Sequence, residues 1–544
     1  MRVSQIYFRN KNKFFSLVSE NPSFKYGEKI YSLTCIVGKN GAGKTRFLNQ
    51  ILENRSNIDL IFEDVRRKIA LKKSGRFESK LMMERVAPSE VRDDFCIIKY
   101  SSAIEYKIPN PTSICYDEST SHFLQIMRLN ELNRHDTVNQ IAVVAKYLSD
   151  IESLISFKDK TFKVTLASEG EAISKLSKKY FNSTMSKYTA KIFEKNLDRN
   201  LTVLKKKFLS ILFDEINIDK QEEAKIKSLF SNIDLQNFSV NDDFYDQLSL
   251  LASPTFSERV KKFFDVYERY DFENIFRSGK KHRFYNDQDI MSLNAVIDYF
   301  FPEIEPSEDS LIKEVLGVLT FSWIGLSSGE ISILNLLGRL YSGKMHYGEV
   351  TNKLLLIDEV DLGLHPEWQR LWVSDVLPLI AKILCTGDQK IQVIITTHSP
   401  IILSDIYTED IIIMPIENEN LGKIKKTFAQ NIYTLYNNTF FLKRLIGEYA
   451  HRRIENTITF LNNRINKNFT LNNENFYYNL DEENQIITID KIIESVGEPI
   501  IAKQLLELYE LAYPNIQLEM KKKRIRERIN TLEEELRKLN EGRR

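Results

Sequence analysis

The chain has 544 residues, enough for three or four domains of ordinary size. Apolar residues make up 42 % of it and charged residues 28 %, with 33 Phe and 24 Tyr, so the chain can bury a core and wholesale disorder is excluded. The 76 Lys and Arg nearly cancel the 75 Asp and Glu, which excludes a strongly basic coat for nucleic acid but leaves a local basic face open.

The N-terminal residues give no sign of export. Charges run through residues 1–15, where a signal peptide needs an apolar stretch. No run of about 18 apolar residues occurs, so we predict no membrane span. The cysteines Cys35, Cys96, Cys115 and Cys385 lie far apart without a C-x-x-C pair, which indicates neither a disulfide framework nor a zinc site. We therefore expect a cytoplasmic protein.

A phosphate-binding loop is predicted next along the chain. The apolar segment 33–37 is typical of a buried strand, and the residues after it fit G-x-x-x-x-G-K-[ST]. Glycines let several backbone N–H groups converge on the phosphates, and the following helix turns its positive end toward them. Lys44 can reach the β- and γ-phosphates, and the Thr45 hydroxyl can bind Mg²⁺. The candidate ATP-binding residues are Gly38, Lys39, Asn40, Gly41, Ala42, Gly43, Lys44, Thr45 and Arg46.

A long helix-rich stretch separates this loop from the later motifs. Within 196–216, apolar residues recur at helical spacing with lysines on the other side; they are Leu197, Leu201, Leu204, Phe208 and Leu212. Strands on either side of the stretch predict a mostly parallel α/β sheet. We expect an α/β domain split by a helical insertion, then an α-rich C-terminal region. The expected ranges are 1–122 (first lobe, with the phosphate loop), 123–312 (insertion), 313–425 (second lobe) and 426–544 (partner-binding region).

The motif L-S-x-G-E stands directly before the apolar segment 331–340. Ser327 or Ser328 would make a good N-cap and Glu330 suits the first turn, so the motif could simply begin a helix. The same helix start would also offer N–H groups and a hydroxyl to a phosphate. The candidate phosphate-binding residues here are Ser327, Ser328, Gly329 and Glu330.

Two further strands end in chemically useful side chains. Asp358 and Glu359 follow the apolar segment 353–357, which we expect beside the phosphate-loop strand. Asp358 would face Mg²⁺ and Glu359 would orient and deprotonate the attacking water. His398 follows the segment 391–397 and is placed to contact the γ-phosphate. The candidate catalytic residues are Lys44, Glu359 and His398, and the candidate metal ligands are Thr45 and Asp358.

This order of motifs resembles the ATP-binding-cassette (ABC) ATPases, and the large insertion before L-S-x-G-E is similar to the SMC/Rad50/RecF branch. In that family two heads clasp two ATP molecules with Mg²⁺, and each L-S-x-G-E motif contacts the γ-phosphate held by the opposite phosphate loop. The resemblance implies a homodimer or higher oligomer, with Ser327, Ser328 and Gly329 acting across the interface.

The sequence departs from the transporter members of the family in two places. Residues 363–366 read G-L-H-P, which resembles the heads of OLD-type and RecF-like proteins. No glutamine suited to the usual Mg²⁺ contact is found, since Ser101 and Ser102 follow the relevant strand. Tyr26 and Tyr31 are candidates for stacking on adenine, with core packing as the alternative for either ring.

The segment 427–448 is a loop that enters an amphipathic helix. Its pattern is similar to the tail of ATPase subunits in Septu-type anti-phage defence, including the version attached to retrons. That resemblance implies a bacterial ATPase that partners an HNH nuclease subunit and, in the retron version, contacts a reverse transcriptase with its RNA–DNA product. We therefore predict that ATP-driven head dimerisation controls a nuclease.

Two other functions stay open. A DNA-repair head would bind DNA itself, and the basic segment 521–528 could contact phosphates, although charge runs are usually solvated. An OLD-like ATPase-nuclease would need a glutamate and a later D-x-D pair; Glu494 and Glu498 lack that pair, so we interpret them as surface carboxylates. The final apolar residues predict a helix that packs on a partner helix or on its own domain; they are Ile525, Ile529, Leu532, Leu536 and Leu539.

Overall fold

The computed structural model describes residues 2–8, 13–16, 26–39, 41–53, 58–63, 68–71, 84–86, 94–105, 113–166, 203–205, 207–209, 211–212, 223–234, 237–269, 281–282, 319–414, 426–438, 444, 446–466, 476–514, 529 and 533. The chain divides into two compact units, residues 1–441 and 442–544. Asn40 of the phosphate loop, Leu197 and Leu201, the basic segment 521–528 and most of the final apolar residues lie outside the described residues.

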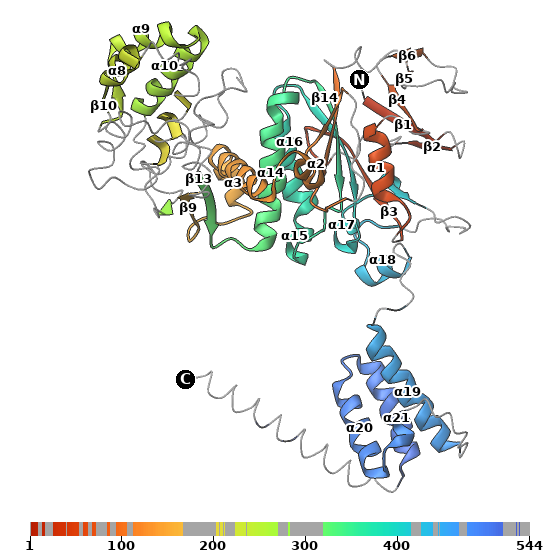
Figure 1. Ribbon diagram of the computed structural model, residues 1–544. Helices are drawn as coiled ribbons and strands as arrows, with labels where there is room; N and C mark the ends of the chain where they lie inside the picture. Colours follow the sequence, from red (N-terminus) through yellow and green to blue (C-terminus); the bar gives the residue numbers. More distant parts are fainter. Residues whose placement is uncertain are drawn as a thin grey trace. The chain divides into compact units, whose positions relative to one another are not determined.

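A six-stranded sheet forms the centre of the first unit (Figure 1). Every pairing in it is parallel, and its strands are near-continuous apolar runs, as expected of a sheet covered on both faces. The parallel α/β sheet and its three sequence-predicted strands are thus confirmed. In spatial order the strands are β16 (Ile411–Ile413), β3 (Ile30–Val37), β15 (Lys390–Thr396), β14 (Asn352–Asp358), β7 (Phe95–Ser101) and β8 (Cys115–Asp117).

The expectation that the acidic strand lies beside the phosphate-loop strand is wrong. β14 pairs with β15 and β7, whereas β3 pairs with β15 and β16. The strand that precedes His398 therefore lies between the other two. An apolar strand pattern carries no information about its neighbours, because the packing of the crossover connections sets the order.

Each face of the central sheet is covered by different elements. On one face, α1 (Lys44–Glu53) packs Phe47 and Leu48 against alternate side chains of β3, β14 and β15. On the other face lie α14 (Ser328–Tyr347) and α16 (Leu377–Leu384), as Figure 1 shows. Shorter elements complete this part: α15 (Pro366–Arg370), the π-helical turn Trp372–Val376, α17 (Pro400–Ser404), the 3-10 turn Thr408–Asp410 and α18 (Ile432–Asn438).

A second, mainly antiparallel sheet lies at the N-terminus, in the order β2-β1-β4-β5-β6. It is joined to the central sheet through Gln392 of β15, whose side chain accepts from the Val3 N–H at 2.7 Å and donates to the Val3 carbonyl at 2.9 Å. The strands are β1 (Arg2–Phe8), β2 (Lys13–Ser16), β4 (Ile58–Glu63), β5 (Lys68–Leu71) and β6 (Glu84–Val86).

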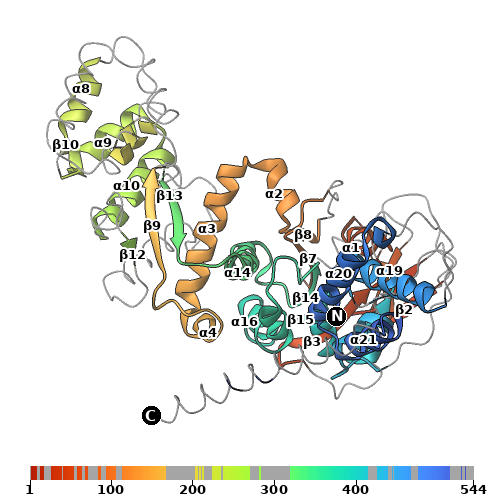
Figure 2. The same cartoon turned by 90° about the horizontal axis from the view of Figure 1, so that it is seen from below.

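The helix-rich stretch leaves and re-enters the fold at one place. β9 (Thr161–Leu166) and β13 (Leu319–Ile324) pair antiparallel, and α3 (Leu129–Lys146) packs along α14 (Figure 2). Where α3 and α14 meet, a Cβ on Gly338 of α14 would lie 2.9 Å from the Asn139 backbone of α3, so glycine permits the close approach of the two helices. The other elements are α2 (Thr120–Ile126), α4 (Leu148–Glu152), α8 (Glu223–Ser231), β10 (Ile233–Asp234), β11 (Ser239–Val240), α9 (Asp242–Leu251), α10 (Pro254–Arg269) and β12 (Lys281–His282).

The predicted amphipathic face around residue 208 is present where the chain is described. Leu204, Phe208 and Leu212 are buried, and the Phe208 ring stacks on Phe263 at 4.9 Å between ring centroids. Lys205 departs from the expected solvent-facing side, because it is 1 % exposed and its Nζ lies 5.4 Å from the centre of the Phe238 ring. The helical spacing predicted that this lysine faces solvent, but its charge is buried and makes a cation–π contact instead.

The second unit is a small helical bundle with its own apolar core. Phe460, Tyr477 and Tyr509 are buried together in it, and the Thr457 and Tyr477 hydroxyls lie 2.8 Å apart. Glu494 and Glu498 are exposed, as interpreted from the sequence. The elements are α19 (Glu448–Ile465), the 3-10 turn Phe476–Asn479, α20 (Glu482–Ser495) and α21 (Pro499–Ala512). Among the described residues of the chain, no helix combines the length and apolar character that crossing a bilayer requires.

Candidate nucleotide-binding site

The phosphate loop has the backbone conformation that its glycines permit. Gly41 and Gly43 have φ angles of +80° and +88°, a region that favours glycine. A Cβ on Gly38 would lie 3.0 Å from the Met414 carbonyl oxygen, so the loop passes close to the end of β16. α1 begins at Lys44, which directs the first N–H groups of the helix into the loop.

Lys44 connects the loop to the acidic sheet edge. Its side chain is buried, and Nζ donates to the Gly38 carbonyl at 3.1 Å. Burial lowers the pKa of Lys44, against the attraction of Asp358, Glu359 and Asp361. The ammonium group is thus held among loop carbonyls with three carboxylates near it, where it can meet a phosphate as a point charge.

Asp358 and Glu359 are oriented by one threonine of the central strand β15. The Thr396 hydroxyl donates to Asp358 Oδ1, and the Glu359 N–H donates to Thr396 Oγ1 at 2.7 Å. Glu359 has a φ of +52°, an uncommon conformation for a residue with a side chain and one often found at functional sites. Burial, and then the charges of Asp358 and Asp361, raise the pKa of Glu359. A carboxylate with a raised pKa is better suited to accept a proton from water.

Asp361 belongs to the site although the sequence patterns did not single it out. Its Oδ1 accepts from the Thr397 hydroxyl at 2.6 Å and from the His398 N–H at 3.0 Å, so it fixes the turn that carries the histidine. Burial, and then the charge of Lys44, lower the pKa of His398, which keeps its imidazole neutral near pH 7. The sequence did contain a signal for Asp361: it is a third carboxylate only three residues after Asp358.

The side chains at this edge fit a Mg²⁺ ion that arrives with a nucleotide. Thr45 follows Lys44 in the first turn of α1, and Asp358 is buried at the end of β14 with one oxygen already bonded to Thr396. A hydroxyl and a single carboxylate are hard oxygen ligands of the kind that Mg²⁺ uses together with phosphate oxygens. Thr45 and Asp358 are therefore the residues that would hold the ion.

The L-S-x-G-E motif begins α14 with a complete capping box. Ser327 is the N-cap: its backbone N–H donates to Glu330 Oε2 at 2.7 Å, and the Glu330 N–H donates to Ser327 Oγ at 3.4 Å. Burial raises the pKa of Glu330, but its hydrogen bonds with Lys160 and then Ser327 hold that pKa below its usual value. Gly329 is buried against Trp368, whose nearest ring carbon would lie 3.3 Å from an added Cβ. The capping function predicted from the sequence is confirmed.

The motif does not join the phosphate loop of its own chain. Ser327 and Ser328 are exposed, and within the described residues the Glu330 side chain bonds to Ser327 and to Lys160. The structure therefore brings together Lys44, Asp358, Glu359 and His398, and leaves the start of α14 as a separate exposed helix end. Tyr26, a candidate for adenine stacking, instead donates its hydroxyl to Asp410 at 2.8 Å and packs edge-on against Tyr407.

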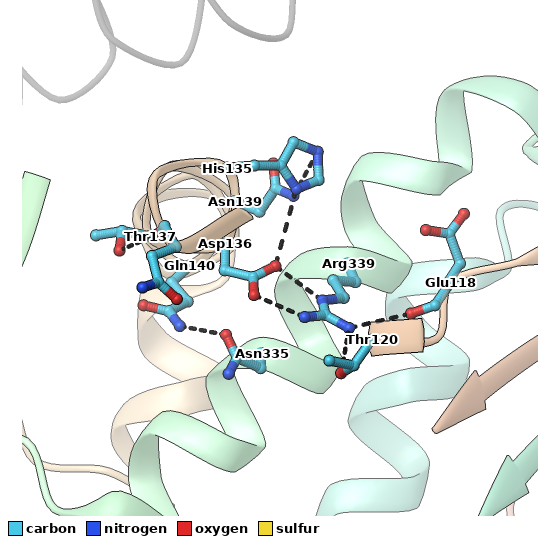
Figure 3. A network of polar contacts seen from close by, with 10 residues as sticks. Glu118, Thr120, His135, Asp136, Thr137, Asn139, Gln140, Asn335 and Arg339 are labelled. Atoms are coloured by element: carbon cyan, nitrogen blue, oxygen red, sulfur yellow. Dashed lines mark hydrogen bonds and ion pairs between the residues drawn. The ribbon is translucent and has the colours of Figure 1, made fainter. Parts of the chain in front are cut away.

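A buried polar network ties α14 to the sheet edge (Figure 3). Arg339 of α14 forms a two-point ion pair with Asp136 of α3, at 2.8 and 2.6 Å. Its remaining nitrogen donates to the Glu118 carbonyl at 3.4 Å and to the Thr120 hydroxyl at 3.0 Å, in the connection from β8 to α2. Because these groups are buried, moving α14 relative to α3 would break paired charges, so the network couples the two helices mechanically.

Glu118 beside this network should make stability depend on pH. Burial raises its pKa to about 8, against the attraction of Arg339, whereas the ordinary value is 4.5. Between these values the folded state keeps the proton and the unfolded state releases it, so stability is lost as pH rises and levels off above the folded pKa. Relative to Glu118→Gln, wild-type stability should fall by up to about 1.4 kcal/mol per pH unit over this interval. Urea unfolding from pH 5.5 to 8.5 measures it, and parallel curves would contradict it.

Comparisons with known proteins indicate ATPase activity. Residues 155–404 match the family model described as "AAA domain, putative AbiEii toxin, Type IV TA system". That range contains the L-S-x-G-E motif, the acidic pair and His398, and the phosphate loop precedes it. The chain is also 22 % identical over 437 residues, or 76 % of its length, to the Escherichia coli protein named "Retron Ec83 probable ATPase", of which 71 % is covered. Residues 155–404 are thus similar to an ATPase domain of this AAA type, and the protein is an ATPase.

Proposed function

We propose that the protein is an ABC-type ATPase head, split by a helical insertion at residues 123–312, that works as a dimer. Two copies close over two ATP molecules, and Ser327, Ser328 and Gly329 of each copy contact the γ-phosphate bound by the other. The observation that carries the proposal is the separation of the two halves of the site. Lys44, Asp358, Glu359 and His398 share one sheet edge, whereas Ser327 and Ser328 at the start of α14 are exposed and the nearby Glu330 side chain bonds to Lys160.

Each residue at the sheet edge has a defined chemical task in ATP hydrolysis. Lys44 stabilises the charge on the β- and γ-phosphates, and the neutral His398 imidazole contacts the γ-phosphate. Glu359 orients the attacking water and accepts its proton. Thr45 and Asp358 hold Mg²⁺, which supplies neutralisation of phosphate charge when it is bound. Thr396 and Asp361 keep the carboxylates and the histidine in place through the hydrogen bonds described above.

A charged side chain at the exposed helix start should prevent head pairing. Ser328→Arg would place a bulky cation where another copy is proposed to dock, and its long side chain can reach solvent without disturbing α14. In the Glu359→Gln background, which should retain ATP, we expect an ATP-dependent dimer that Ser328→Arg abolishes. Size-exclusion chromatography with light scattering measures it. Arg452→Ala, on the exposed face of α19 in the second unit, is the control that should dimerise normally. A dimer unaffected by Ser328→Arg would refute contact across the interface.

We further propose that this ATPase belongs to a cytoplasmic anti-phage defence complex of the Septu or retron type. The similarity to a retron ATPase over most of the chain supports the proposal, as does the pattern of segment 427–448. Head closure and reopening would then control a bound HNH nuclease subunit, and in a retron complex the assembly would include a reverse transcriptase with its RNA–DNA product. The separately folded unit 442–544 offers a surface for such a partner.

Purification of the tagged native protein tests the defence proposal. We expect an HNH protein to co-purify and mass spectrometry to identify it, with nuclease-resistant RNA–DNA in the complex if a retron is involved. The chain recovered without a nuclease, but with DNA affinity that falls steeply with salt, would favour the DNA-repair alternative. Metal-dependent nicking by this polypeptide alone would favour the OLD-like alternative.

A further inference from the structure

A buried serine next to Asp358 has no hydrogen-bond partner within the described part of the chain. Ser101, the last residue of β7, is 0 % exposed, and its Oγ accepts and donates no bond to another described residue. Buried polar side chains are nearly always hydrogen-bonded to protein or to ordered water. The contacts of the described residues therefore do not account for this unpaired hydroxyl.

The register of the sheet places the Ser101 hydroxyl beside Asp358. Ser101 is the direct partner of Asp358 across the β7–β14 pair. Partners on adjacent strands project from the same face, so both side chains lie on the face that α1 covers. Thr396, on the other side of Asp358, already donates its hydroxyl to Asp358 Oδ1. Asp358 is thus flanked by one bonded hydroxyl and one unbonded hydroxyl.

The nearest carboxylate along the chain after Ser101, that of Glu105, is bound by other side chains. Glu105 is bound by Lys99 Nζ and by Asn49 Nδ2, the latter at 2.7 Å from Oε2. The Glu105 backbone N–H also donates to Ser121 Oγ at 2.5 Å. The Glu105 carboxylate thus has hydrogen-bond partners on both oxygens, whereas the Ser101 hydroxyl has none among the described residues.

We propose that Ser101 is a positioning residue for the Mg²⁺ of bound ATP, and that its hydroxyl hydrogen-bonds a water in the coordination shell of the ion beside Asp358. The proposal rests on the proposed Mg²⁺–ATP site. Mg²⁺ gives up its waters reluctantly and usually keeps several, so partners for those waters are part of its binding site. Loss of such an outer partner typically weakens metal affinity by about 10-fold or more.

Metal binding, rather than ATP turnover, tests the assignment. In full-length protein saturated with a non-hydrolysable ATP analogue, Mn²⁺ affinity measured by electron paramagnetic resonance should fall about 10-fold in Ser101→Ala. Analogue affinity in EDTA, measured by calorimetry, should not change. Ser101→Thr, which keeps a hydroxyl, should recover much of the Mn²⁺ affinity.

Ser119 provides a matched control. It too is 0 % exposed, and its Oγ has no partner among the described residues, but it follows β8, which pairs with β7 and not with the acidic strand. Ser119→Ala should leave Mn²⁺ affinity unchanged; an equal loss in both alanine variants would reduce Ser101 to a packing residue and overturn the proposal.

Two further outcomes are decisive. Unchanged Mn²⁺ affinity in Ser101→Ala would also overturn the assignment, whereas wild-type protein that binds no nucleotide would overturn the proposed site itself. If Ser101→Ala does not fold, Ser101→Cys keeps the volume and replaces the hydroxyl with a poor hydrogen-bond former, and the same loss of Mn²⁺ affinity is expected.

Discussion

Replacing Lys44 with alanine should abolish ATP binding and hydrolysis. The ammonium group is the positive side chain that the structure places between the phosphate loop and three carboxylates, so its loss leaves triphosphate charge facing Asp358, Glu359 and Asp361. Removal of one such preorganised group typically costs about 100-fold or more in the stabilisation of phosphate or oxyanion charge. Calorimetric titration with ATP and Mg²⁺, together with phosphate release, measures both effects.

The loss should not come from unfolding. Burial lowers the pKa of Lys44, which offsets part of what its attraction to the carboxylates contributes, so the alanine variant should melt close to the wild-type temperature. Lys382→Ala is the control, because Lys382 lies on the exposed side of α16 in a surface pair with Asp150. ATP affinity within a few-fold of wild type in Lys44→Ala would remove the basis for the phosphate-loop assignment.

Glu359→Gln should separate ATP binding from ATP turnover. The amide keeps the shape and the backbone contact with Thr396 but cannot accept a proton, so we expect ATP affinity near the wild-type value and turnover slower by about 10²- to 10⁴-fold. Removing a negative charge near Lys44 should, if anything, strengthen binding of the triphosphate. Single-turnover phosphate release and ATP titration on the same preparation distinguish the two effects.

The pH dependence gives an independent check on Glu359. Its raised pKa predicts that wild-type turnover falls, as pH decreases, at a higher pH than for an ordinary glutamate, and that this acid limb disappears in the glutamine variant. Glu367→Gln is the matched control, since Glu367 is an exposed glutamate paired with Arg370 on α15. Wild-type rates in Glu359→Gln would exclude it as the general base and direct attention to Asp361.

Features that depend on a short stretch of chain were predictable. The phosphate loop follows a strand and opens a helix because its glycines, its lysine and its apolar flanks are contiguous, and the structure begins α1 at Lys44. The helix after L-S-x-G-E was likewise set by Ser327 and Glu330, whose reciprocal bonds form the capping box. The dimer, the nuclease partner and the four domain ranges depend on surfaces beyond any one motif, and they stay predictions.

The sequence by itself determined that a glycine-rich loop opens a helix and that an acidic pair and a histidine stand at strand ends, because each motif is local and each apolar strand is followed directly by its candidate functional residues. Only the tertiary structure decided that β15 lies between β3 and β14, which puts Thr396 against Asp358 and Ser101 on its other side. It also decided that Asp361 holds the His398 turn and that Arg339 is paired inside the fold. Those contacts join residues more than thirty positions apart, and long-range packing, which no local pattern records, selects them.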